Sequence, residues 1–429
     1  MNVEEYLATF CNRTKNPTLK AMEYFMGEFG HPEKDLKIIH IAGTNGKGSC
    51  TEMITNILLH SGYEVGKFIS PHLINYNERI SINNKNITNQ EMEELVKELM
   101  PKVDKYNSLN NPKITLFELE TTMAILYFYR NNCDFVVLET GLGGLYDCTN
   151  IVNPIISIIT SIGYDHMSIL GNTLLEITEQ KAGIIKENSE TIFIEQEEKE
   201  VNDKIKEICS NKSNILHLIK KENISNYSYD KDFQKFDYKN YKNILINLKG
   251  KKQIYNASIC IECAEILKNK SYKISEKEIR EGLKTTIHKG RFETISKEPL
   301  IIYDGAHNKP AIENFMNSVQ IYYKNSEKVY IISILKTKDY KTILKELLKD
   351  EKSIFIFTDG NDKEIYVSKE ELYNEAKKHT NSKSLYMYKL EDALSLTREK
   401  YKNHVTFIVG SFYIYGTVIK NLEDNLVEK

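Results

Sequence analysis

The sequence has little of what marks three classes of protein. Its seven cysteines are an odd number scattered over 429 residues, which suits reduced thiols better than a disulfide framework. No stretch reaches the roughly eighteen consecutive apolar residues of a membrane span. The first residues also lack the basic segment and apolar core of a secretory signal. We therefore expect a cytoplasmic protein that is not embedded in a membrane.

An excess of charge of either sign is also missing. Lys and Arg number 58 and Asp and Glu number 60, so the formal net charge is −2. A balance this even argues against a nucleic-acid or anionic-membrane partner and favours small-molecule substrates. With 41% hydrophobic and 28% charged residues, the chain is typical of a globular protein. Its length allows two or three domains, and we expect a monomer.

Apolar strand-like runs alternate with helical patterns, which predicts the α/β class with a parallel-rich sheet covered by helices. Strands are expected at 37–42, 65–70, 135–139, 155–161 and 191–194, and helices at 50–59, 89–100, 117–129 and 174–186. The pattern restarts as a smaller, Rossmann-like α/β unit with strands at 300–303, 329–335, 354–358 and 405–409. We predict domains at 1–293 and 294–429, with a hinge within 289–299, where Gly290 and Pro299 interrupt any regular pattern. The polar stretch 211–252 reads as a peripheral hairpin or excursion.

One short motif could be read as a metal or redox site. Cys260 and Cys263 form a C-x-x-C pair. They lie in an apolar helical stretch with no second cysteine pair and no histidine at zinc-finger spacing, so we interpret them as buried small hydrophobes.

The strongest local signal is an apolar strand, 38–42, that breaks into a glycine-rich loop before a helix. The loop contains Gly43, Thr44, Asn45, Gly46, Lys47, Gly48 and Ser49. Glycines let backbone N–H groups approach phosphate oxygens, the helix N-terminus adds positive potential, and the lysine neutralises phosphate charge. Ile41 stands where the strict P-loop pattern has its first glycine, so this is a variant loop. A purely structural turn is the alternative.

With these residues in place, the chain resembles the folylpolyglutamate synthase and dihydrofolate synthase family of the Mur ligase superfamily. Further segments match the family in order and spacing: Gly30–Pro32, Ser70–Leu73, Glu78–Ile80, Glu139–Gly144, Ile162–His166, Leu170–Thr173, Lys181–Lys186, Gly290–Glu293, Asp304–Asn308 and Gly410–Tyr413. The resemblance implies an N-terminal P-loop ATPase domain, a C-terminal Mur ligase-type domain, and ATP with Mg²⁺ as cofactors.

The resemblance also implies the magnesium site. It places the ligands on Ser70, Glu139 and His166, which follow predicted strands at the edge where α/β sheets bind ligands. A lone histidine after a strand is more often a structural hydrogen-bonder. Lys181 alone would be interpreted as an exposed lysine. The resemblance instead implies a carbamylated lysine that binds a second magnesium ion.

Other site residues follow from the resemblance in the same way. Asn256 would contact adenine. The alternative is that Asn256 is simply the N-cap of a helix, and both roles can hold at once. Arg291, Asp304 and His307 would reach ATP from the second domain, across a cleft that closes on the nucleotide. For Asp304 and His307 the alternative is an ordinary Asx turn. The residues implied in catalysis are Lys47, Lys181 and His307.

The acceptor site is where the sequence departs from the family. Thr115, Phe117 and Asp147 resemble residues that meet the pterin ring, although Phe117 could be helix core. Leu145-Tyr146 stand where Arg-Leu is usual, and Cys148 replaces Ala. Since an arginine's charge is missing, we expect this site to treat an acidic substrate differently from the rest of the family.

The implied reaction is ATP-dependent ligation of L-glutamate to the carboxylate of dihydropteroate or a reduced folate, through an acyl phosphate. The rivals are another amino-acid ligase of the Mur superfamily and a catalytically silent nucleotide-binding regulator. Only 42 residues precede Gly43, which argues against the uridine-nucleotide domain of a cell-wall ligase. The residue types that the family uses are present at Lys47, at the implied magnesium ligands and at Lys181, which argues against the silent regulator.

Overall fold

The structure is a computed structural model that describes residues 6–11, 17–230, 232–360, 362–380 and 384–427. The chain forms two compact units. The first comprises 1–227, 235–246 and 253–286, and the second comprises 228–234, 247–252 and 287–429. The boundary predicted from the sequence, between 293 and 294, falls inside the second unit.

The first unit is built on an eight-stranded sheet with the order β4-β3-β2-β5-β1-β6-β7-β8. Six neighbouring strands are parallel: β2 (Val65–Phe68), β5 (Phe135–Glu139), β1 (Ile38–Ala42), β6 (Ile156–Ile159), β7 (Glu190–Ile194) and β8 (Ile215–Ile219). Strand β3 (Ile80–Ile82) runs antiparallel to both of its neighbours, β2 and β4 (Lys85–Asn86). Strands β1, β2 and β5 are buried along their whole length, as expected of strands covered on both faces.

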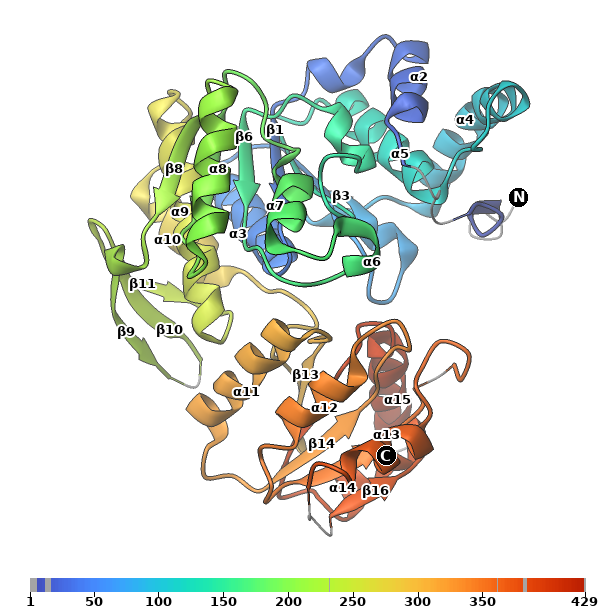
Figure 1. Cartoon of the computed structure of the whole chain (residues 1–429), viewed down its shortest axis with the longest axis vertical. Helices are drawn as coiled ribbons and strands as arrows, with labels where there is room; N and C mark the ends of the chain where they lie inside the picture. The colour runs from blue at the N-terminus through green and yellow to red at the C-terminus, as the bar shows by residue number, and fades with distance from the viewer. Residues whose placement is uncertain (1–5, 12–16, 231, 361, 381–383, 428–429) are drawn as a thin grey trace. The chain divides into compact units, whose positions relative to one another are not determined.

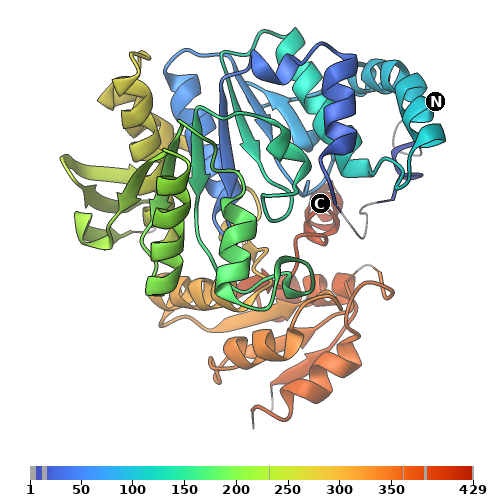
Figure 2. The ribbon, with the colours of Figure 1, turned by 45° about the horizontal axis from the view of Figure 1, so that its top comes forward.

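Helices cover both faces of this sheet (Figure 1, Figure 2). On one face pack α2 (Lys20–Glu28), α4 (Asn89–Leu109), α5 (Leu116–Arg130), α7 (Leu174–Ala182) and α8 (Lys199–Asn211). Helix α3 (Lys47–His60) contacts β1, β2 and β5 and packs against α10 (Glu276–Thr285). Two further α-helices are the short α6 (Met167–Leu170) and α9 (Lys251–Asn269).

The polar stretch 211–252 folds into β8 and a small sheet. The strands β9 (Ile224–Tyr229), β10 (Gln234–Tyr238) and β11 (Tyr241–Ile246) form this sheet in the order β11-β10-β9. Buried residues such as Phe236, Tyr238 and Ile244 alternate with polar ones, which gives the sheet one apolar face.

The second unit has a six-stranded sheet with the order β12-β13-β17-β14-β15-β16. Strand β12 (Glu293–Lys297) runs antiparallel to β13 (Leu300–Asp304), while β17 (Val405–Val409), β14 (Lys328–Ile332), β15 (Ile354–Phe357) and β16 (Leu385–Met387) are parallel. The helices are α11 (Lys309–Tyr323), α12 (Tyr340–Leu347), α13 (Lys369–Ala376), α14 (Leu390–Glu399) and α15 (Tyr415–Val427). The predicted hinge thus contains a paired strand.

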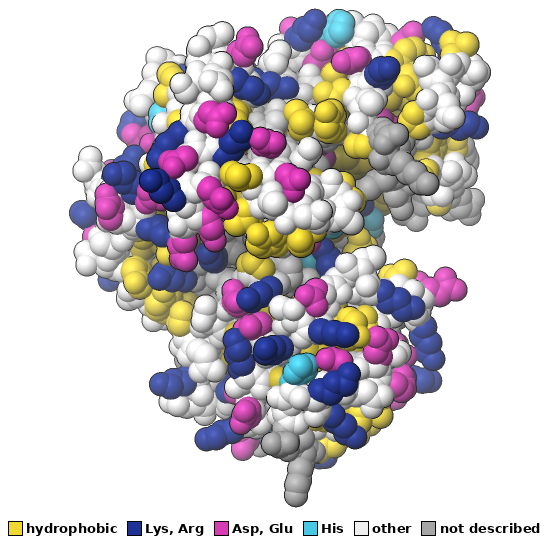
Figure 3. All heavy atoms as spheres, viewed as in Figure 1, with side chains coloured by type: hydrophobic (Ala, Val, Ile, Leu, Met, Phe, Trp, Pro, Cys, Tyr) yellow, Lys and Arg dark blue, Asp and Glu magenta, His cyan; other side chains and the backbone are white. Residues whose placement is uncertain are grey.

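The predicted α/β class and the two-part architecture are confirmed. Among the described residues, no helix combines the length and apolar character needed to cross a bilayer. On the face of the molecule in Figure 3, basic and acidic side chains are interspersed, in keeping with the balanced composition.

Candidate active site

The glycine-rich loop follows β1 at the middle of the first sheet, and α3 begins within it at Lys47. The loop needs glycine at two positions, because Gly43 has φ +149° and Gly46 has φ +96°. A Cβ on Gly43 would lie 1.9 Å from Thr160 Oγ1. The backbone at this turn is therefore closely packed against the residue that follows β6.

The segment after β6 fixes this loop in place. Thr44 Oγ1 donates to Gly163 O and accepts from Gly163 N, both at 3.0 Å. Ser161 Oγ accepts from Asn45 N at 3.1 Å, and Thr160 Oγ1 donates to Asn45 O at 2.8 Å. Thr160 and Ser161 are functional residues that no motif in the sequence marks; the available signal was two hydroxyls at the carboxyl end of a buried strand. A loop held this way needs little reorganisation to bind phosphate.

Two lysine amines meet at this turn. Lys47 Nζ and Lys181 Nζ both donate to Gly43 O, at 3.2 and 3.1 Å. The buried Glu139, at the end of β5, lies with Oε1 4.0 Å from Lys47 Nζ. The structure therefore brings together three of the residues that the sequence implicated, from α3, α7 and β5.

Lys181 is buried, with 4% of its surface exposed, so the alternative interpretation as an exposed lysine is wrong. The predicted helix 174–186 ends at Ala182, and α7 carries Lys181 inward beneath the loop after β5. There Leu145 N donates to Gln180 O at 2.7 Å, and a Cβ on Gly144 would lie 2.6 Å from Lys181 O. Burial and the neighbouring charge of Lys47 lower the pKa of Lys181 to about 7.

The predicted magnesium ligands follow neighbouring parallel strands. Ser70, Glu139 and His166 come after or at the ends of β2, β5 and β6, so they belong to one edge of the sheet. His166 has φ +50° before α6, and its Nε2 lies 3.8 Å from Asp165 Oδ1. The described residues contain no cluster of three or more His, Cys, Asp or Glu side chains suited to a metal. Any magnesium here would therefore take part of its coordination from hydroxyl, phosphate or water oxygens, which this ion accepts.

Two of the three predicted acceptor-binding residues, Phe117 and Asp147, lie at the loop after β5. Thr115 is the N-cap of α5, where its Oγ1 accepts from Glu118 N. The half-buried Phe117 ring packs against Gly141, whose Cβ would lie 2.5 Å from Phe117 Cζ. Asp147 is 6% exposed and accepts from Leu142 N at 2.8 Å and Thr149 N at 3.1 Å. These contacts leave Phe117 and Asp147 as candidates for binding the acceptor. The Thr115 hydroxyl is already used as the cap of α5.

Asn256 does not cap α9, because this helix begins at Lys251; the N-cap interpretation is wrong. Asn256 Nδ2 donates to Gln253 Oε1 at 2.9 Å, and Gln253 Nε2 donates to Ser49 Oγ at 3.1 Å. A Cβ on Gly46 would lie 2.6 Å from Asn256 Oδ1. The amides of Gln253 and Asn256 thus lie against the phosphate loop, and Gln253 was missed by the sequence analysis.

In the second unit, Arg291, Asp304 and His307 are neighbours at the end of β13. Asp304 accepts from Ala306 N at 2.8 Å and from Phe292 N at 3.0 Å. Burial raises the pKa of Asp304 to about 6, against the lowering effect of the Arg291 charge. His307 Nδ1 lies 2.7 Å from Gly305 O, and the Arg291 guanidinium lies 4.3 Å from the centre of the Phe412 ring. The hydrogen bond from Ala306 N to Asp304 forms the Asx turn that was the alternative interpretation of Asp304.

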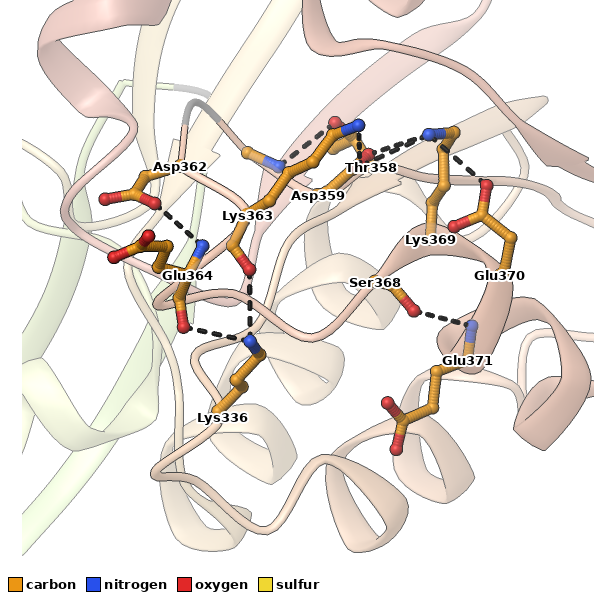
Figure 4. A network of polar contacts seen from close by, with 11 residues as sticks. Lys336, Thr358, Asp359, Asp362, Lys363, Glu364, Ser368, Lys369, Glu370 and Glu371 are labelled. Carbon is orange, nitrogen blue, oxygen red and sulfur yellow. Dashed lines mark hydrogen bonds and ion pairs between the residues drawn. The ribbon is translucent and has the colours of Figure 1, made fainter.

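A second polar network braces the segment after β15 in the same unit (Figure 4). Asp359 contacts Lys369 at 3.2 Å and Lys363 at 4.0 Å, while Lys336 Nζ donates to Lys363 O and Glu364 O. These contacts satisfy each other internally, so we assign them to holding the loop between β15 and α13.

Known proteins resemble this chain over most of its length. The Mur ligase middle domain matches residues 41–264, and the C-terminal domain of dihydrofolate synthetase matches residues 288–421. A dihydrofolate synthase/folylpolyglutamate synthase of Bacillus subtilis is 35% identical over 95% of each chain. The dihydrofolate synthetase of Saccharomyces cerevisiae is 31% identical over 77% of this chain and 78% of its own. The crystal structure of a folylpolyglutamate synthase from Thermotoga maritima is 29% identical, with a TM-score of 0.84, covering 99% of this chain and 96% of that one.

Proposed function

Because the chain belongs to the dihydrofolate synthase/folylpolyglutamate synthase family, we propose that it is an ADP-forming ligase that joins L-glutamate to a carboxylate of dihydropteroate or a reduced folate. The observation that carries this proposal is the meeting of Lys47 and Lys181 at Gly43 O, beside Glu139. A glycine-rich loop, a helix N-terminus and two amines form a site for the phosphates of ATP.

The chemistry needs an activated carboxylate, because a carboxylate is a poor electrophile at neutral pH. The acceptor oxygen attacks the γ-phosphorus of ATP, the bond to the β,γ-bridging oxygen breaks, and ADP leaves. The amine of glutamate then attacks the acyl phosphate, and inorganic phosphate departs as the amide forms. In the first step Lys47 spreads the charge of the transferring phosphoryl group, which is how protein groups mainly lower this barrier.

The residues at this edge fit a magnesium ion held with the phosphates. Glu139 offers a buried carboxylate and Ser70 a hydroxyl, and the αL backbone at His166 turns the chain beside Asp165. A bound magnesium would neutralise phosphate charge. Lys181 adds a further possibility that rests on its own surroundings. With its pKa lowered to about 7, much of this amine is neutral at pH 7.5, and a neutral amine can add carbon dioxide to form a carbamate.

The acceptor would lie against Phe117 and Asp147. A flat pterin ring suits the Phe117 face, and its N–H donors suit the Asp147 carboxylate. Leu145 and Tyr146, exposed beside Asp147, take the place of the usual Arg-Leu. Without that cation, we expect a weaker preference for acceptors that already carry extra glutamates.

We also propose that the protein works as a cytoplasmic monomer on these small molecules. Size-exclusion chromatography with light scattering tests the oligomeric state, and fractionation of the source cells tests the location.

An acceptor panel tests the function. Purified protein is given ATP, Mg²⁺ and labelled glutamate with either dihydropteroate or tetrahydrofolate, and ADP release is followed in parallel. Label on dihydropteroate alone means a dihydrofolate synthase, label on tetrahydrofolate alone means a chain-extending synthase, and label on both means a bifunctional enzyme. ATP binding without transfer to either acceptor would overturn the proposal in favour of another amino-acid ligase or a silent regulator.

A further inference from the structure

His40 is an unexpected residue at the centre of the first sheet. It is completely buried in β1, where the other four residues, Ile38, Ile39, Ile41 and Ala42, are apolar. Side chains alternate along a strand, so His40 shares its face of the sheet with Ile38 and Ala42, which pack against the helices on that side. An apolar residue would fill this place without the desolvation cost of an imidazole, so its polar atoms call for an explanation.

The imidazole is the first member of a hydrogen-bonded relay. His40 Nε2 lies 2.8 Å from Thr149 Oγ1, and Thr149 Oγ1 donates to Asp147 Oδ1 at 2.5 Å. A hydroxyl has one proton, and here it goes to the carboxylate, so His40 must be the donor of the first bond through Nε2–H. The relay therefore has one direction, from β1 to the loop after β5.

The surroundings keep His40 in that state. Burial, with the charge of Lys186, lowers the pKa of His40 to about 3, so the ring is neutral at any working pH. Its Nδ1 is buried and has no hydrogen-bond partner among the described residues. A buried acceptor left in this condition costs stability, and what the ring gains in exchange is the single bond to Thr149.

The relay ends on the buried carboxylate of Asp147, which has an acceptor position left. Asp147 accepts from Leu142 N, Thr149 N and Thr149 Oγ1. A carboxylate offers about four acceptor positions, so one remains for a further donor. The three internal donors fix the plane of the carboxylate, and His40 fixes the hydroxyl that contributes the shortest of them.

We propose that His40 is a positioning residue for acceptor recognition, which acts through the Thr149 hydroxyl to hold the Asp147 carboxylate toward an N–H donor of the pterin ring. This inference rests on the proposed function, in which Asp147 contacts the acceptor. It assigns a specific task to a residue that touches neither ATP nor the reacting carboxylate.

Paired substitutions test the relay. His40→Leu and Thr149→Val remove the relay bonds, while His40→Gln and Thr149→Ser keep a donor or a hydroxyl in place. We expect each disruptive variant to raise the KM for the pterin acceptor about tenfold, with kcat and the KM values for ATP and glutamate within about twofold. The conservative variants should recover most of the loss. The double variant His40→Leu/Thr149→Val should be about as impaired as either single one, because both break the same relay.

Ser157→Ala is the matched control. Ser157 is the partner of His40 in the register of β1 with β6, is equally buried, and donates one hydrogen bond to Ile184 O at 2.8 Å. This variant should lower the melting temperature without changing the KM for the acceptor. If it raises that KM as much as His40→Leu does, or if the disruptive variants raise the KM for ATP equally, His40 is merely structural and the inference is wrong.

The thermal unfolding of every variant is measured first. If His40→Leu does not fold, the variants Thr149→Val and Thr149→Ser test the relay by themselves. Thr149→Val is expected to fold, because Val and Thr have nearly the same shape. An inactive wild-type protein would contradict the proposed function, whereas an active wild-type protein whose Thr149→Val variant keeps its KM for the acceptor would contradict only the role of His40.

Discussion

In both units a sheet strand ends in a turn that contains glycine and leads into a helix, but the side chains around the two turns differ. After β1, a glycine turn brings two lysine amines to one carbonyl oxygen, and α3 begins at Lys47. After β13, a glycine turn is held by the buried carboxylate of Asp304, and α11 begins at Lys309. The edge of an α/β sheet offers a place for a site in both units, and the side chains decide its charge.

Both turns keep an ionisable group in an unfavourable place. Burial lowers the pKa of Lys181 to about 7 and raises that of Asp304 to about 6. In each case burial shifts the pKa against the charged form, which is typical of groups retained for function. Substitutions at equivalent positions of the turns after β1 and β13 test how the two turns differ.

The largest difference should come from the first residue of each helix. Lys47→Ala should lower kcat by about 10³-fold, because a positioned cation on the transferring phosphoryl group is lost. Lys309→Ala should change kcat less than about twofold, since this lysine is exposed and pairs loosely with Glu313 at 3.8 Å. ADP release at saturating substrates measures both. Equal losses would mean that Lys47 has no special part.

The glycines of the two turns provide the next comparison. Gly43→Ala forces a Cβ against Thr160 Oγ1 at 1.9 Å in a left-handed backbone conformation, so we expect kcat/KM to fall about 10²-fold. A Cβ on Gly305 would meet the Phe412 ring at 2.0 Å, and a ring can turn aside, so Gly305→Ala should cost about tenfold or less. Steady-state kinetics on folded variants checks the order. A larger loss from Gly305→Ala would reverse the ranking of the two turns.

Lys181 should make stability depend on pH in the alkaline range. Its folded-state pKa, about 7, lies below the value of 10.5 for an exposed lysine. Between these values the unfolded chain binds the additional proton, so the free energy of unfolding rises with pH across pH 7 to 10.5. Lys181→Met should remove this slope and be more stable at pH 7 by an amount on the order of a few kcal/mol. Urea unfolding in buffer free of carbon dioxide measures it, and parallel curves for the two proteins would contradict it.

Asp304 should give the opposite slope in the acid range, with the smallest effect. Its folded-state pKa, about 6, lies above 3.8, so the folded protein binds the additional proton between these values. The free energy of unfolding should therefore fall as pH rises from 3.8 to 6. Asp304→Asn should lack this fall, a difference of about 1–3 kcal/mol between pH 4 and pH 7. The same urea experiment would contradict the account if both proteins lost equal stability.

The sequence predicted the elements whose pattern is local. The apolar run 135–139 is β5, and the loop before α3 has its glycines where the backbone needs positive φ. The helix predicted at 89–100 begins at Asn89 as expected, after the N-cap Thr88, but α4 continues through Pro101 to Leu109. The polar stretch 211–252 gave no usable period, because β9 to β11 are short and half exposed.

What the sequence could not supply were the contacts between distant segments. Without the family resemblance, Lys181 would have been taken for a surface residue, since its burial depends on the loop after β5 packing over α7. Asn256 was placed at a helix start because nothing local marks Lys251 as the first residue of α9. The sequence shows His40 only as a polar residue within an apolar strand. Its hydrogen-bond partner Thr149 is 109 residues away, so no local pattern indicates their contact.

The transfer of oxygen from the acceptor to phosphate tests the central claim most directly. The acceptor is prepared with ¹⁸O in the carboxylate that receives glutamate, and the products of turnover with unlabelled ATP are examined by mass spectrometry. Since the acyl phosphate takes one carboxylate oxygen and the amide retains the other, we predict one ¹⁸O atom in each inorganic phosphate released, together with ADP. Phosphate without ¹⁸O, or AMP in place of ADP, would contradict phosphoryl transfer at the Gly43 turn.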